Sequence, residues 1–94
     1  MRYYPINLDL AGRSVLVVGG GVIAEGKARQ LVEAGARVRI VSPALTDPLS
    51  ELANAGTLAW RRGVFAESDL DGVWLVISAT DDQTVNETVA QAAA

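Results

Sequence analysis

Cysteine and histidine are both absent from the 94 residues of this chain. Disulfide bonds and thiolate catalysis are therefore excluded, and the two commonest ligands of transition metals are missing. Carboxylates alone could still hold a metal ion, but no pattern in the sequence calls for one. We expect no metal site.

Basic residues and long apolar runs are also scarce. Eight Lys and Arg residues stand against eleven Asp and Glu residues, which gives a formal charge of -3. A nucleic-acid partner requires a concentrated basic surface, and the pair Arg61 and Arg62 is too short to supply it. No apolar run approaches the ~20 residues of a membrane span, and no signal segment opens the chain. We expect a cytoplasmic protein without a nucleic-acid or membrane partner.

What the sequence does contain is an alternation of strand and helix patterns. Residues 14–18 form a continuous apolar run that ends in three glycines, as a strand buried on both faces requires. The period then becomes helical over residues 22–34, with Gly35 placed to close the helix in a left-handed conformation. Further strands are expected over residues 3–8, 37–41, 57–61 and 73–79.

Two more helices complete the pattern. Asp47 is expected to cap a short helix with Pro48 at its first position, and Gly56 ends that helix. Residues 80–83 have the form of a capping box at the start of a last helix. Strands alternating with helices predict an α/β fold, a Rossmann-like parallel sheet with helices on both faces. The whole of residues 1–94 reads as one such domain, cut after the helix that follows its fourth nucleotide-fold strand.

The glycine turn carries the main functional signal. Gly19, Gly21 and Ala24 satisfy the spacing G-x-G-x-x-A between a strand and a helix. Gly19 permits the tight turn, Gly21 lets backbone approach a pyrophosphate, and Ala24 lets the helix pack closely on the strand. The free N–H groups at the helix start then hold the anion.

Two neighbouring loops give weaker signals. An acidic residue about 20 positions after the glycines would bind the adenosine ribose, but the second strand ends in Ser42 and Pro43. Ser42 either donates to a ribose hydroxyl or a 2′-phosphate or only ends the strand, so the residues leave NAD and NADP open. In the classical order of this fold the first and fourth strands are neighbours, so we expect Thr80 to lie close to the glycine turn and to touch the nicotinamide ribose.

Other motifs follow in order along the chain: Tyr4-Pro5-Ile6, Leu8-Asp9-Leu10, Lys27, Glu33-Ala34-Gly35-Ala36, Val41-Ser42-Pro43, Phe65, Asp69-Leu70, Ala79-Thr80-Asp81-Asp82 and Val85-Asn86. Together with the glycine turn they resemble the N-terminal domain of siroheme synthase, in the precorrin-2 dehydrogenase/sirohydrochlorin ferrochelatase family. The resemblance covers essentially the whole chain.

This resemblance implies NAD-dependent oxidation of precorrin-2, a tetrapyrrole, to sirohydrochlorin on the route to siroheme, with ferrochelatase activity in bifunctional members. It places cofactor contacts on Val22, Ile23, Pro43 and Ala44, favours NAD over NADP, and implies a homodimer for the full-length protein. The family's catalytic aspartate lies beyond Ala94, so no catalytic residue is assigned and the 94 residues alone are expected to be inactive.

The sequence departs from the family pattern at two positions: Gly26 stands where a basic residue is usual, and Ala44 where an acidic one is frequent. The alternative function is a nucleotide-sensing regulatory Rossmann module without catalysis. Such a sensor generally requires an acid at the end of the second strand, where this chain has Ser42.

Overall fold

The structure, a computed structural model, describes residues 9–79. Their helices and strands follow in this order: β1 (Ser14–Val18), α1 (Val22–Glu33), β2 (Arg37–Ser42), α2 (Asp47–Asn54), β3 (Ala59–Arg62), the 3₁₀ helix η1 (Glu67–Leu70) and β4 (Leu75–Ser78). The predicted strand over residues 3–8 and the predicted helix from residue 80 onward lie outside the described residues.

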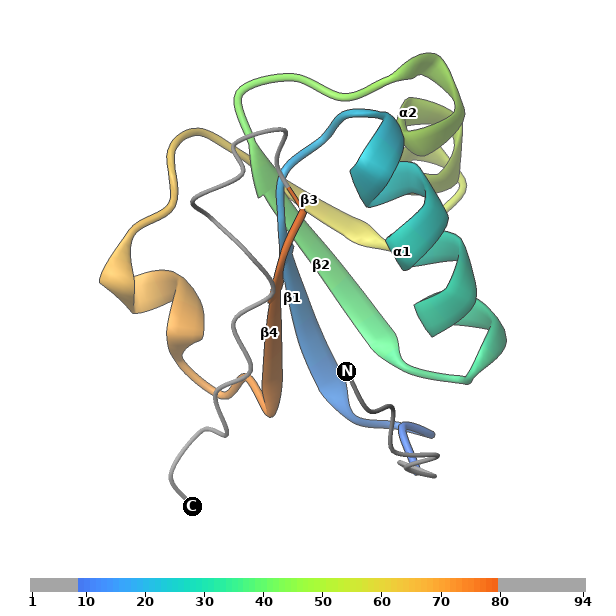
Figure 1. Cartoon of the computed structure of the whole chain (residues 1–94), viewed down its shortest axis with the longest axis vertical. Helices are drawn as coiled ribbons and strands as arrows, with labels where there is room; N and C mark the ends of the chain where they lie inside the picture. Colours follow the sequence, from blue (N-terminus) through green and yellow to red (C-terminus); the bar gives the residue numbers. More distant parts are fainter. Residues whose placement is uncertain (1–8, 80–94) are drawn as a thin grey trace, which may run out of the picture.

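The four strands form one parallel sheet in the order β3-β2-β1-β4 (Figure 1). Val18, the last residue of β1, pairs in register with Val41 of β2 and with Ser78 of β4. The prediction that the first and fourth strands are neighbours is therefore confirmed. Within the described residues β4 lies at one end of the sheet and β3 at the other.

The predicted elements agree with the structure except at their ends. β1 has the predicted bounds, and β2 continues one residue further, to Ser42. β3 runs from Ala59 to Arg62 instead of residues 57–61, because its pairing with β2 begins at Ala59 and continues to Arg62. β4 is shorter than the predicted strand over residues 73–79. Gly35 follows α1 with a φ of 85°, which confirms the left-handed closure of that helix.

The start of α2 corrects one prediction. Thr46, not Asp47, is the N-cap, and its Oγ1 accepts a hydrogen bond of 3.4 Å from the amide of Leu49. Asp47 and Pro48 therefore lie within the first turn of the helix. Both residue types suit these positions, because an acid there favours the positive helix end and proline needs no amide partner.

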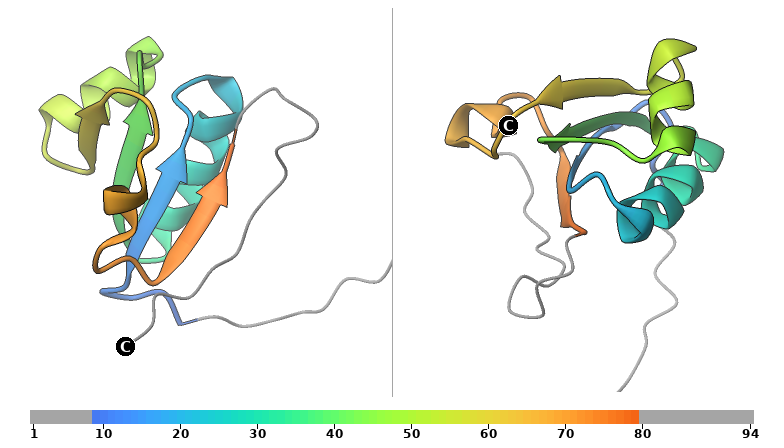
Figure 2. Two further views of the ribbon diagram at one scale, coloured as in Figure 1. Left: turned by 90° about the vertical axis from the view of Figure 1, so that its left-hand side faces the viewer. Right: turned by 90° about the horizontal axis from the view of Figure 1, so that it is seen from above.

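Both α-helices pack on the same face of the sheet, as the two views in Figure 2 show. Apolar side chains of β1 and β2 meet the inner sides of α1 and α2 there, and the largest shared cluster includes these residues: Val15, Val17, Ala24, Ala28, Leu31, Ile40 and Leu49. This is the expected result of two successive right-handed crossovers made in the same direction across the sheet.

The second face is covered differently. A smaller cluster of Leu16, Val41, Val73 and Val76 lies on it, with Leu70 of η1 packed alongside. The segment from residue 63 to residue 71 is a loop with one short helical turn. Within residues 9–79 both α-helices lie on the first face, and the predicted helix from residue 80 onward lies outside the described residues.

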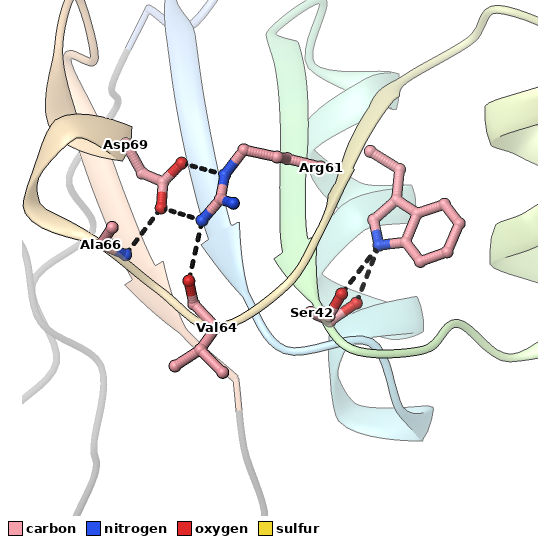
Figure 3. A network of polar contacts seen from close by, with 6 residues as sticks. Ser42, Arg61, Val64, Ala66 and Asp69 are labelled. Atoms are coloured by element: carbon pink, nitrogen blue, oxygen red, sulfur yellow. Dashed lines mark hydrogen bonds and ion pairs between the residues drawn. The ribbon is translucent and has the colours of Figure 1, made fainter.

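Arg61 and Asp69 fasten that loop to the end of β3 (Figure 3). The Asp69 carboxylate, only 3% exposed, accepts hydrogen bonds from Nε and Nη2 of Arg61 and one of 2.7 Å from the amide of Ala66. Arg61 Nη2 also donates to the carbonyl of Val64 at 2.8 Å. The Arg61 hydrogen bonds hold the pKa of Asp69 below its ordinary value, although burial of the carboxyl opposes this shift.

The Asp69→Asn variant removes the charge of this pair and is expected to lower Tm by about 5 °C at pH 7. A carboxyl whose pKa is depressed in the folded state stabilises the fold at every pH above the pKa that it has in the unfolded state. This contribution is lost as pH falls through the pKa that it has in the folded state. Between pH 5 and pH 2, Tm of the parent should therefore fall further than Tm of Asp69→Asn. Asp71→Asn, at an exposed position on the same segment, is the control and should follow the parent.

Candidate functional site

The loops at the carboxyl edge of the sheet bring the predicted site residues together. All four strands are parallel, so the loops after Val18, Ser42, Arg62 and Ser78 leave the sheet at the same edge (Figure 1). Ligands of open α/β sheets bind outside this edge. The glycine turn and residues 42–44 both lie there, whereas Thr80 is outside the described residues.

Gly19 makes the turn out of β1. Its φ of 132° lies in a region that side chains disfavour, and its amide donates to the carbonyl of Val41 at 3.0 Å. The chain thus keeps a last hydrogen bond to β2 while it leaves the sheet. The tight turn predicted at Gly19 is therefore observed.

Gly20, the middle glycine, has a role that the sequence reasoning missed. A Cβ at this position would collide with the carbonyl oxygen of Ala44 and lie 2.5 Å from the hydroxyl of Ser42. The carbonyl of Gly20 accepts a hydrogen bond of 3.0 Å from the amide of Thr46. The glycine turn therefore rests directly on the loop after β2. The only local signal for this contact is that all three residues of the turn are glycines.

Gly21 immediately precedes α1 and faces open space. It is the N-cap in an extended conformation, no side chain caps the helix, and a Cβ added to it would meet no described atom within 4 Å. Val22 and Ile23 follow with exposed fractions of 77% and 45%. The amides of this first turn and the positive helix end are thus available to an anion at the edge.

Ala24 differs from the residues before it because its side chain is buried. It packs in the core cluster between α1 and the sheet and is fully inaccessible. The predicted close approach of helix and strand is therefore observed. Any contact of Ala24 with a ligand comes through its backbone.

Ser42 has a structural role in the turn that follows β2, which is the second of the two alternatives predicted for it. Its side chain is 3% exposed, and its hydroxyl donates to the carbonyl of Ala44 at 2.7 Å and accepts from Nε1 of Trp60 at 3.1 Å. A serine hydroxyl has one proton, and here it is used within the turn. Pro43 and Ala44 are exposed beside it.

Arg62 is a further residue of this edge, and the sequence reasoning considered it only as part of a basic pair. It pairs in register with Ser42, and the next amide along the chain, that of Gly63, donates to the carbonyl of Ser42 at 2.9 Å. Its side chain is exposed. Only the pairing of β2 with β3 shows that this cation lies beside residues 42–44.

Residues 9–79 contain no group of three or more acidic side chains that could hold a metal ion. Within the same range, neither helix combines the length and the apolar character needed to cross a membrane.

Comparison with known proteins points to one family. Residues 6–94 match the family described as "Putative NAD(P)-binding". Siroheme synthase 1 of Aeromonas salmonicida is 50% identical over 93 residues, which are 99% of this chain and 20% of that protein. The siroheme synthase of Stutzerimonas stutzeri is 50% identical over 91 residues, covering 97% of this chain and 20% of the relative.

A solved structure agrees with these relatives. The precorrin-2 dehydrogenase SirC superposes with a TM-score of 0.80 at 40% identity, over 88% of this chain and 42% of that protein. The chain thus spans about one fifth of the length of the siroheme synthases and less than half of the dehydrogenase.

The contact at Gly20 can be tested by adding one methyl group. Gly20→Ala would push a Cβ into the backbone of Ala44, so we expect a loss of about 2 kcal/mol in the free energy of unfolding. Gly26→Ala is the matched control, because Gly26 lies within α1 with nothing near its missing Cβ; it should gain up to about 1 kcal/mol. Urea titrations of both variants measure the difference. Equal stabilities would contradict the packing of the glycine turn on residues 42–44.

Proposed function

The chain belongs to the NAD(P)-binding family represented by the N-terminal domain of siroheme synthases, and we propose that its carboxyl edge binds the dinucleotide used to oxidise precorrin-2. The observation that carries this proposal is the uncapped start of α1 behind Gly21, with open space where a side chain would stand. Such a helix start is suited to a pyrophosphate, because its amides and its dipole both favour negative charge.

The residues present fit the two halves of the dinucleotide. Gly19 and Gly21 shape the turn, and the backbone amides of Val22, Ile23 and Ala24 would hold the pyrophosphate. The adenosine half would lie against Pro43 and Ala44, which are exposed and held in place by Ser42.

The nicotinamide half would extend toward the end of β4. β4 lies beside β1, the strand that leads into the glycine turn, and it ends at Ser78. Thr80 follows two residues later, and we propose that it contacts the nicotinamide ribose. The family resemblance favours NAD over NADP as the cofactor of this reaction.

When bound, NAD supplies a hydride acceptor. The reaction would transfer a hydride from precorrin-2 to NAD and release a proton, giving sirohydrochlorin and NADH. We assign to this chain the binding and orientation of the cofactor, and to the full-length protein the catalytic groups, any ferrochelatase activity and the homodimer. No observation among the described residues favours the regulatory-sensor alternative, and β2 ends in Ser42 where such a sensor generally has an acid.

Binding of the pyrophosphate can be tested at Gly21. Gly21→Val places a branched side chain in the open space before α1 and should weaken NAD binding at least tenfold, measured by calorimetry on the full chain. Gly26→Val makes the same chemical change at another open position of the helix and should leave the affinity within about twofold. Circular dichroism checks that both variants fold. Equal NAD affinity of Gly21→Val and Gly26→Val would remove the glycine turn from the binding site.

The tetrapyrrole part of the proposal has its own test. When sirohydrochlorin is added anaerobically to the full chain with NAD, the absorbance spectrum of sirohydrochlorin should shift, because a precorrin-2 dehydrogenase domain has to bind this tetrapyrrole. A nucleotide sensor would bind the dinucleotide and leave the tetrapyrrole spectrum unchanged. That second result would favour the regulatory alternative over the oxidation of precorrin-2.

A further inference from the structure

The adenosine side of the candidate site contains no carboxylate at the end of β2. Ser42, Pro43 and Ala44 follow one another there, and the next acid along the chain, Asp47, lies in the first turn of α2. An acidic residue at this place binds the ribose 2′-hydroxyl of NAD and repels the 2′-phosphate of NADP. This chain lacks that means of rejecting the phosphate.

Arg62 brings a positive charge to the same place. It is the register partner of Ser42 in the parallel pairing of β2 with β3. Two groups on either side of it in the chain, the indole Nε1 of Trp60 and the amide of Gly63, both donate to the carbonyl of Ser42. The backbone of Arg62 is therefore held beside residues 42–44 and does not depend on a flexible loop for its position.

The direction of the Arg62 side chain follows from its neighbour. Arg61 points to the second face of the sheet, where it binds Asp69 (Figure 3). Successive side chains of a strand point to opposite faces, so Arg62 points to the face that carries α1 and α2. Its side chain is exposed, and no ion pair or side-chain hydrogen bond joins it to another residue within residues 9–79.

The proposed pyrophosphate site at the start of α1 adjoins residues 42–44. Gly20 rests on Ser42 and Ala44, and its carbonyl accepts from the amide of Thr46, so the glycine turn and the loop after β2 form one continuous surface. The adenosine of a dinucleotide held at α1 would thus have its ribose beside residues 42–44, within the neighbourhood of Arg62.

We propose that Arg62 is a specificity-determining residue that binds the 2′-phosphate of NADP, so that this chain accepts NADP as well as NAD. The proposal rests on the dinucleotide site proposed above. A guanidinium presents several N–H donors in a planar fork that matches phosphate oxygens, and these charge-assisted hydrogen bonds are about twice as strong as neutral ones. The end of β2 itself carries no carboxylate that would repel the 2′-phosphate.

Calorimetry with NAD and with NADP tests this on the parent chain and on Arg62→Gln. The parent should bind NADP at least as tightly as NAD. Arg62→Gln should weaken NADP binding about tenfold and change NAD binding less than twofold, because only NADP carries the 2′-phosphate. Arg37→Gln is the matched control: Arg37 is also exposed, but it lies at the start of β2, at the opposite edge of the sheet, and both affinities should stay within about twofold.

The outcomes separate the two proposals. If NAD binds but NADP does not, or if Arg62→Gln weakens both dinucleotides equally, the role of Arg62 is wrong and the dinucleotide site stands. If neither dinucleotide binds the folded parent, the site itself is wrong and the role of Arg62 falls with it. A steeper loss of NADP than of NAD affinity with rising salt would support the phosphate contact, and Arg62→Gln should abolish the difference.

Discussion

The carbonyl of Ser42 accepts two hydrogen bonds from β3 and the residue after it, 3.1 Å from Nε1 of Trp60 and 2.9 Å from the amide of Gly63. The hydroxyl of the same residue holds the carbonyl of Ala44, and Gly20 can rest on both only because it has no side chain. The end of β2 therefore joins the loops after β1, β2 and β3. Buried polar groups are costly unless they are paired, so this satisfied cluster favours one arrangement of the edge.

The glycine turn is consequently a surface made of backbone. Gly19, Gly20 and Gly21 contribute no side chains, and the first turn of α1 offers amides behind the exposed Val22 and Ile23. The position of this first turn depends on β1, in which Leu16 and Val17 are fully buried on opposite faces of the sheet. A core of this kind holds the helix start rigidly with respect to the sheet, which is what an anion site without charged side chains requires.

Local patterns were enough to predict the order of strands and helices, because an apolar run such as residues 14–18 and a helical period such as that of α1 are properties of adjacent residues. The roles of Ser42 and Gly20 depend instead on contacts made across the sheet, with Trp60 and Ala44. Thr46 was missed as the cap of α2 for another reason. Thr46 and Asp47 are both good caps, and only the backbone geometry decides between them.

Arg61 and Arg62 are the same residue type and adjacent in the chain, but the alternation of side chains along β3 gives them different surroundings. As a pair in the sequence they indicate only a weak basic patch, too small for nucleic acid. The alternation of the strand sends Arg61 to the second face, where the carboxylate of Asp69 neutralises it and raises the pKa of its guanidinium. Arg62, one residue on, is left with an exposed charge at the carboxyl edge. Exchange of the two neighbours' roles would require β3 to shift by one residue, which would also take the indole of Trp60 away from Ser42. The bond between Trp60 and Ser42 therefore fixes which of the two arginines stabilises the fold and which one faces a ligand.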